Sequence, residues 1–487
     1  MQGKKYTEEL IRVGINFSLL LVFWGGMLRK NFNSDTIYHM LSGDADIFSR
    51  IEVGRYVVAF FDYILLKLGV RVTDNLSISM LVAFFMFLGA MIVIQKTFSR
   101  WEPEELAGKI GYNFVLVLVF FNVLFAEVLM FGEYSIYFGL GYLLAAAGVK
   151  RYADRKYASM LLLFAMAVCT YQFTMIYAAI LVTVYGCLEH DEKLSMEAVK
   201  RELIGIVAAM GMGAANYISI KILEKAGIVR AFGKHAGTGN IGKKALAMTE
   251  SFIELHKNSL GILPNLWIPF LFTLGVTVLL IYSCVKRQVV KKLLFIVIAF
   301  VGSLLLLYVI PVLQETFSFP PRMAFCFYLV QGLLAVTAYV VCLDKVRWLL
   351  SLGCIGYMLV QLLFCDFVVT NRFVSNTLDE VYVSMMYQKV LKYEKETGTE
   401  VTKICVVKDA YAPDHYEEVN YGAHQINERV LGTTTISFIE HVTGRHFKKV
   451  KCDEEIYDQY FKDKDWNYLD LSEQLIFQGD TVYWCIF

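Results

Sequence analysis

The chain has 487 residues, of which 57% are hydrophobic and 19% are charged, and its formal net charge is +1. This composition lies outside that of soluble globular proteins and predicts a membrane protein with many spans, and the charge gives no indication of a nucleic-acid partner. The ten cysteines lie mostly in apolar runs and include no CxxC pair, so neither a disulfide framework nor a zinc site is predicted.

The chain begins with a basic segment, MQGKKYTEELIR, that leads into the first apolar run. No small-residue cleavage site follows it, which predicts a retained first span rather than a signal peptide. A bilayer core of about 30 Å needs about 20 apolar helical residues. Eleven candidate spans follow at 13–28, 76–95, 111–127, 134–149, 157–170, 172–188, 203–223, 260–284, 293–311, 323–343 and 347–367. Whether 157–188 forms one broken span or two stays open.

The segment 50–69, RIEVGRYVVAFFDYILLKLG, is apolar enough for a span but carries five charges. A charge near the bilayer centre costs at least ~2.5 kcal/mol. On a helical wheel Glu52, Arg55 and Asp62 share one face and apolar residues cover another. The segment is therefore predicted as one amphipathic helix that lies in the membrane interface.

Lysines and arginines predict the orientation. With 50–69 lying flat, 19 of them fall in inside segments and 13 in outside loops, whereas a spanning 50–69 would reverse the balance. The N-terminus is then inside and the C-terminal part outside.

One predicted outside loop, 224–259, is unusually basic. It is either a flexible connection or an anion-binding surface, in which Gly237, Gly239 and Gly242 let the backbone approach a phosphate near Lys243 and Lys244.

The chain becomes polar after about residue 368 and has no further span-length apolar run. Strand-like runs at Lys403–Val407, Thr433–Phe438 and Thr481–Phe487, and a helical pattern over 378–396, predict a small α/β domain outside the membrane. The predicted domains are thus a mostly α transmembrane domain at 1–367 and this α/β domain at 368–487. No catalytic motif is legible in the second domain, which favours a capping or substrate-shaping role.

Polar residues collect at the predicted outer ends of the spans. The loop 31–55 after the first span is acidic and contains Asp35, Asp44 and Asp46. The others are Glu127, Glu133 and Tyr134 between the third and fourth spans, Gln172 at the 170–172 hairpin, and Arg322 after two prolines. A solvated connector with interfacial side chains remains an alternative. A proton relay or ion path would instead place carboxylates near the midplane, where none form a row.

The order of these motifs resembles the bacterial O-antigen glucosyltransferases of the Gtr type II kind, membrane enzymes with a GT-C-like architecture. The matching pieces are Asn33–Ser34–Asp35, Gly54–Arg55, FNVLFAEVLMFGEYSIYF, CTYQFTMIYAAI and the PPR before a late span, over roughly residues 10–345. Two positions depart from the family pattern. Ser34–Asp35 stands where an acidic pair is often expected, so Asp44 or Asp46 would supply any second carboxylate, and Glu133 replaces an expected Asp.

The resemblance implies transfer of a hexose, with glucose as the first candidate, from a polyprenyl-phosphate sugar to a lipid-linked or cell-surface glycan at the outer face of the bacterial inner membrane. Asp35 would be the general base, and Arg55 and Arg322 would bind the donor phosphate. A phosphate leaving group implies direct displacement with inversion. The remaining candidate substrate-binding residues are Glu127, Glu133, Tyr134, Gln172, Lys243 and Lys244. A divalent cation, Mg²⁺ or Mn²⁺, on Asp35, Asp44 and Asp46 stays open.

The implied partners are the polyprenyl-phosphate donor, the glycan acceptor, the bilayer, a companion flippase and a polyprenyl-phosphate sugar synthase. Two other functions compete with glycosyl transfer. A flippase or transporter would need charged residues along a cavity across the membrane, and a non-enzymatic scaffold of envelope assembly would use the polar tail as a binding module.

Overall fold

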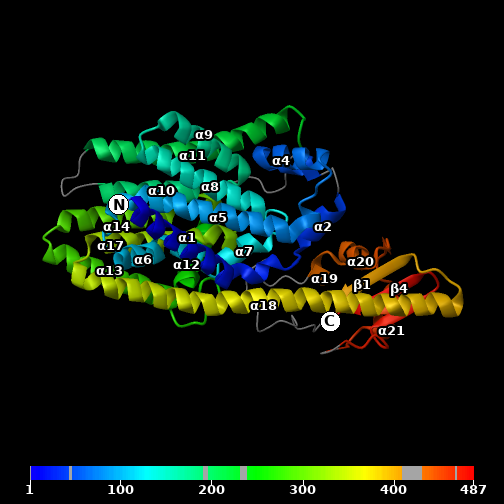
Figure 1. Ribbon diagram of the computed structural model, residues 1–487. Coiled ribbons are helices and arrows are strands. Elements are labelled where there is room, and N and C mark those ends of the chain that lie inside the picture. Colours follow the sequence, from blue (N-terminus) through cyan, green and yellow to red (C-terminus); the bar gives the residue numbers. More distant parts are fainter. Residues whose placement is uncertain are drawn as a thin grey trace. The chain divides into compact units, whose positions relative to one another are not determined.

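The computed structural model describes residues 2–42, 46–189, 196–230, 239–408, 430–464, 466 and 469–486, which are mostly helical with one small sheet near the C-terminus (Figure 1). The chain forms two compact units. We call Met1–Arg29 with Asp44–Phe367 the membrane unit, and Lys30–Gly43 with Val368–Phe487 the tail unit. The segment that contains Asp35 therefore belongs to the tail unit.

Among the described residues, six helices are long and apolar enough to cross a membrane: Tyr6–Leu28, Thr73–Trp101, Val199–Lys225, Ile268–Lys286, Pro321–Val341 and Val346–Thr397. Four shorter apolar helices cover Leu106–Phe120, Tyr157–Thr170, Thr174–Glu189 and Lys292–Leu306. These helices confirm the membrane-protein class, while the count of eleven spans and their orientation stay predictions.

The first half of the membrane unit is a series of helices joined by short 3₁₀ turns. Its elements are α1 (Gln2–Trp24), η1 (Gly25–Leu28), α3 (Asp46–Glu52), α4 (Tyr56–Lys67), η3 (Thr73–Asn75), α5 (Leu76–Phe98), η4 (Ser99–Trp101), α6 (Leu106–Val117), η5 (Leu118–Phe120), α7 (Phe125–Met130), α8 (Ser135–Ala153), α9 (Tyr157–Thr170) and α10 (Thr174–Glu189). The segment 157–188 is thus two helices.

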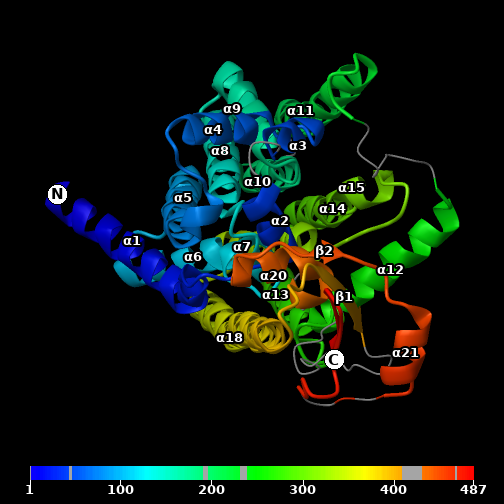
Figure 2. The same cartoon turned by 90° about the vertical axis from the view of Figure 1, so that its right-hand side faces the viewer.

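Helix α8 packs against α5 and α9 (Figure 2). At Gly148 an added Cβ would lie 2.5 Å from the Phe164 ring, so this close packing requires glycine.

The second half of the membrane unit consists of α11 (Met196–Lys225), α12 (Ile241–Asn258), α13 (Ile268–Lys286), α14 (Val290–Leu306), α15 (Val309–Leu313), α16 (Pro321–Ala324), α17 (Cys326–Val341) and the first part of α18 (Asp344–Thr397). The loop predicted over 224–259 is not a loop throughout, because residues 241–258 form helix α12.

Asn240 caps α12 by accepting a hydrogen bond from the Lys243 N–H at 3.0 Å. The span expected at 260–284 begins only at Ile268, because Ser259 and Trp267 adopt left-handed conformations.

The single amphipathic helix expected over 50–69 is also wrong, since a turn at 53–55 separates α3 from α4. Gly54 has φ +74°, a conformation that favours glycine. The Asn216 side chain donates to the Gly54 carbonyl at 2.8 Å, and an added Cβ at Gly54 would lie 2.7 Å from the Asn216 Oδ1. The turn is therefore fixed by its contact with α11.

The span expected over 111–127 is interrupted, because the chain leaves the helix at 121–124 before α7 begins. Asn122 explains the break. Its side chain donates to the Val119 carbonyl at 2.7 Å and accepts from the Phe125 N–H at 3.2 Å. An asparagine side chain bonded in this way competes with the helical hydrogen bonds of its own backbone.

The tail unit combines α2 (Ser34–Ser42), the end of α18, α19 (Val430–Thr433), α20 (Thr435–Thr443) and α21 (Glu454–Tyr460) with strands β1 (Lys403–Lys408), β2 (Lys448–Lys449), β3 (Leu475–Gln478) and β4 (Thr481–Ile486). The sheet order is β2-β1-β4-β3. Strand β1 runs parallel to β2 and β4, and β3 runs antiparallel to β4. The structure confirms a small sheet and the strands predicted at 403–407 and at the C-terminus.

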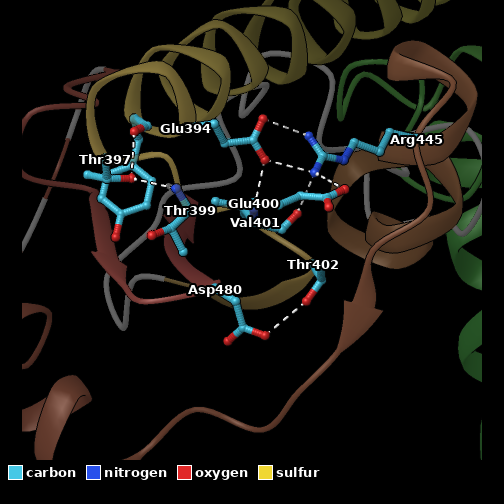
Figure 3. A network of polar contacts seen from close by, with 9 residues as sticks. Glu394, Thr397, Thr399, Glu400, Val401, Thr402, Arg445 and Asp480 are labelled. Atoms are coloured by element: carbon cyan, nitrogen blue, oxygen red, sulfur yellow. Dashed lines mark hydrogen bonds and ion pairs between the residues drawn. The ribbon is translucent and has the colours of Figure 1, made fainter.

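Two local predictions in this region change. The strand expected at Thr433–Phe438 is wrong, because 435–443 form α20, which buries Phe438 and Ile439 and ends at Gly444 with φ +69°. The helix expected at 378–396 is the end of the 54-residue α18, which no proline interrupts and which ends just before Gly398. Arg445 ties this helix end to the sheet, since its guanidinium contacts both carboxylate oxygens of Glu394, at 2.8 and 3.0 Å, and the Val401 carbonyl (Figure 3).

Candidate active site

The carboxylate of Glu127 is fully buried and binds Arg322 through two hydrogen bonds. Its Oε1 accepts from the Arg322 guanidinium at 2.6 Å, and its Oε2 accepts from the Arg322 backbone N–H at 2.6 Å. The Arg322 side chain is 29% exposed. The pair thus has a buried negative partner and an accessible positive one.

Local structure fixes both members of this pair. Glu127 lies on α7, immediately after the break at 121–124. Arg322 follows Pro320 and Pro321 in the first turn of α16, where a backbone N–H has no partner within the helix. A carboxylate near such a helix start is stabilised by the orientation of the peptide dipoles.

A second group of basic and aromatic side chains surrounds Tyr134. The guanidinium carbons of Arg50 and Arg55 lie 4.1 and 4.6 Å from the centroid of the Tyr134 ring. Arg55 also lies 5.8 Å from the centroid of Tyr171. Burial raises the pKa of Tyr171, which sits in the turn between α9 and α10, so its hydroxyl stays protonated. These contacts hold planar cations against aromatic faces.

Arg50 is itself paired. Its Nε contacts Asp62 on α4 at 3.3 Å, and the Tyr137 hydroxyl donates to the same carboxylate. The pair joins α3 and α4 to α8. Glu133, the residue before Tyr134, is 1% exposed.

Gln172 contacts the turn at 53–55. Its amide donates to the Val53 carbonyl and lies 3.5 Å from the Asn216 Oδ1. Together with the Asn216 contact to Gly54, this hydrogen bond holds the backbone that precedes Arg55. Gln172 therefore helps to position the backbone of the turn that contains Arg55.

Asp35 lies in the tail unit, in the first turn of α2. Asn33 begins this helix by accepting from the Thr36 N–H at 2.6 Å. The preceding Phe32 backbone is bound by Arg372 and Asn376 of α18. Asp35 is exposed and forms no hydrogen bond or ion pair with residues that the structure describes, and its exposed face also carries Tyr38 and Leu41.

The two lysines predicted near a phosphate differ in environment. Lys243 is exposed at the start of α12. Lys244 is 6% exposed, and its ammonium group donates to the Val312 carbonyl at 2.9 Å. Gly237 lies outside the described residues, so the glycine-lined anion surface stays a prediction.

The described part of the chain contains no group of three or more His, Cys, Asp or Glu side chains placed to hold a metal ion. Asp44 and the side chain of Asp46 lie outside the described residues, so a cation bound by Asp35, Asp44 and Asp46 stays untested. Arg322, Glu127, Arg55 and Tyr134 all belong to the membrane unit, whereas Asp35 belongs to the tail unit.

Comparison with known proteins adds the deciding observation. The model of the family "Glucosyl transferase GtrII" matches residues 26–339, which is more than half of the chain. The chain belongs to the GtrII glucosyl transferase family. The resemblance to Gtr type II enzymes is thereby confirmed, and the family together with the long apolar helices identifies a membrane glucosyltransferase. No curated protein and no solved structure matches the chain.

The family match spans α7, α16 and the turn at 53–55, and therefore all the contacts described around Glu127 and Arg55 in this GtrII glucosyl transferase. Sequence reasoning did not single out several residues of this region as part of the site. The sequence pattern places Arg50 and Asp62 on one helix, whereas in the structure the turn between α3 and α4 brings them into contact. Tyr171 adjoins the predicted Gln172, so its aromatic character beside a polar hairpin residue was the available signal.

Proposed function

We propose that this glucosyltransferase moves glucose from a polyprenyl-phosphate donor to a lipid-linked or cell-surface glycan at the outer face of the bacterial inner membrane. The observation that carries the proposal is the Glu127–Arg322 pair. A guanidinium whose position is fixed by a buried carboxylate can present its remaining N–H donors to a phosphate. Arg55, held against Tyr134 and Tyr171, supplies a second cation of the same kind.

The chemical step we infer is a direct displacement. Asp35 accepts the proton of the acceptor hydroxyl as its oxygen forms a bond to the anomeric carbon. The bond from that carbon to the phosphate oxygen breaks, and the electron pair leaves on polyprenyl phosphate, whose charge Arg55 and Arg322 stabilise. The configuration at the anomeric carbon inverts. The exposure of Asp35 supports this role, because its carboxylate oxygens form no hydrogen bond or ion pair with the residues that the structure describes.

The other predicted residues take supporting roles in this proposal. Glu133 and Tyr134 contact sugar hydroxyls, whereas Glu127, whose carboxylate is fully buried, acts on the donor through Arg322. Lys243, which is exposed, assists phosphate binding. Lys244 and Gln172 act instead on the backbone, because their polar groups contact the Val312 and Val53 carbonyls. We also infer that the fold is of the GT-C kind.

The proposal is tested with the purified full chain, labelled polyprenyl-phosphate glucose and isolated glycan acceptor. We expect Asp35→Asn to lower turnover ~100- to 10,000-fold, the range for loss of a general base. Asp74→Asn, at another exposed acidic residue, is the matched control and should keep the parental rate. Near-parental turnover of Asp35→Asn, with loss in Asp44→Asn or Asp46→Asn, would show that a different carboxylate is the base.

A further inference from the structure

The break at 121–124 leaves non-helical backbone between two apolar helical segments, η5 and α7. In an apolar environment each backbone N–H and carbonyl without a hydrogen bond costs several kcal/mol, so such a break persists only where other groups bind it. Side chains from distant parts of the membrane unit do so. The Trp24 indole donates to the Phe120 carbonyl at 3.0 Å, and the Val123 N–H donates to Gln361 at 3.1 Å.

Gln361, on α18, is fully buried and is bound at both ends of its amide. Its Oε1 accepts from the Val123 N–H, which can only donate, so its Nε2 faces the Tyr328 hydroxyl at 3.0 Å. That hydroxyl also contacts the Ser259 hydroxyl at 2.6 Å. The amide therefore has one orientation, and the backbone at Val123 is held in one place.

Glu127 follows Val123 by four residues, which is about one helical turn. Helix α7 has only six residues, so the position of its first turn determines that of Glu127. Both Glu127 oxygens accept hydrogen bonds from Arg322, at distances that a small shift of α7 would lengthen. Gln361 is thus connected to Glu127 through the backbone of 123–127 and does not contact it directly.

We propose that Gln361 is a positioning residue for the Glu127–Arg322 pair. It binds the Val123 N–H inside the break, two residues before α7 begins, fixes the start of α7, and so keeps the Arg322 guanidinium in the orientation that receives the donor phosphate. The inference rests on the proposed function of this pair.

The chain offers a matched control in Gln331. This second buried glutamine, on α17, also binds through its amide, to the Pro269 carbonyl, the Thr273 hydroxyl and the Tyr357 hydroxyl. Among the residues that the structure describes, it forms no hydrogen bond with the break at 121–124. Both glutamines belong to one buried polar network, because Tyr357, which donates to Gln331, stacks on Tyr328, which accepts from Gln361. Replacing either by leucine removes a buried amide from this network, and of the two only Gln361 also binds the Val123 N–H.

The test compares Gln361→Leu with Gln331→Leu in the transfer assay, with donor titrated and thermal unfolding measured in parallel. We expect Gln361→Leu to lower kcat/KM for the donor about 10- to 100-fold, since small misplacements of a binding group have effects of that order. Gln331→Leu should lose less than about 3-fold at a comparable change in melting temperature. In the Arg322→Lys background, Gln361→Leu should cause little further loss, because residues that act through one another are not additive.

Equal losses in the two leucine variants, or full additivity with Arg322→Lys, would overturn the positioning role. If Gln361→Leu does not fold, Gln361→Met gives the same comparison with a side chain of similar shape. Failure of the proposed function has a separate signature. Parental activity of Glu127→Gln would remove the pair from the site and the inference with it, whereas an inactive Glu127→Gln with a parental Gln361→Leu would refute the inference alone.

Discussion

The membrane unit and the tail unit each contain an arginine bound by both oxygens of one glutamate, yet the two pairs differ in setting. Glu394 and Arg445 are partly exposed, with relative exposures of 17% and 20%, and join the end of α18 to the strand that follows it (Figure 3). Glu127 is fully buried, and Arg322 reaches it through its own backbone as well as its side chain. The chemistry of the pair is the same, so the surroundings decide its role.

The Glu394–Arg445 pair has a structural role that its neighbours account for. Arg445 binds Glu394 and the Val401 carbonyl, and the consequence is a fixed turn between helix and sheet. Around Glu127–Arg322 the chain instead carries a helix break, a left-handed turn and arginines stacked on Tyr134. Such irregular backbone is costly in an apolar region and is typical of binding and catalytic sites.

The largest expected effect concerns which side of the membrane each loop faces. A cysteine is either labelled from outside or not, so the expected result is all or none. A cysteine introduced in place of Asn240 should be labelled from outside by an impermeant reagent, and one in place of Ala153 should be labelled only after the membrane is opened. The expectation follows from the distribution of lysine and arginine along the chain. Labelling of position 153 from outside would refute the orientation.

The next prediction separates the two pairs by activity. Glu127→Gln should lower glucosyl transfer at least about 100-fold, because it leaves Arg322 without its buried counter-charge. Glu394→Gln should leave turnover unchanged and lower the free energy of unfolding by about 1 kcal/mol, as expected for a partly exposed pair. Transfer rates and denaturant unfolding of the two variants measure both effects. Equal loss of turnover in the two variants would contradict the distinction.

A smaller effect is expected from two glycines with positive φ. Gly54→Ala places a Cβ 2.7 Å from the Asn216 side chain, in addition to the strain of about 1–2 kcal/mol that a left-handed conformation causes. Gly444→Ala, in the tail unit, carries the same strain but meets no atom within 4 Å. We expect a larger loss of thermal stability and donor affinity for Gly54→Ala. Identical melting temperatures and donor KM values would show that the turn before Arg55 is not constrained by α11.

The sequence predicted the features that depend on long patterns. The apolar runs predicted a helical membrane protein, short strand-like runs predicted β1 and β4, and the order of polar motifs predicted the family. The helix at 378–396 was located but not its continuity, because the polarity changes at about 368 while the helix does not.

The features that shape the candidate site were less accessible to sequence reasoning. The run 111–127 is apolar throughout, and the break depends on the side chain of Asn122 and on Gln361, more than 200 residues later. The turn at 53–55 depends on contacts from Asn216 and Gln172. Hydropathy and periodicity describe neighbours along one helix and carry no information on such distant partners.

Arg322→Lys tests the central claim, that Arg322 binds the donor phosphate, most directly. Lysine keeps the charge and can still reach lipid headgroups, but it cannot contact a carboxylate and a phosphate through a planar fork. Transfer should be measured over a range of polyprenyl-phosphate glucose concentrations for the parent, Arg322→Lys and Arg445→Lys. We predict a rise of at least about 10-fold in the donor KM or an equivalent loss of turnover for Arg322→Lys, and parental kinetics for Arg445→Lys. Parental transfer by Arg322→Lys at every donor concentration would contradict the claim.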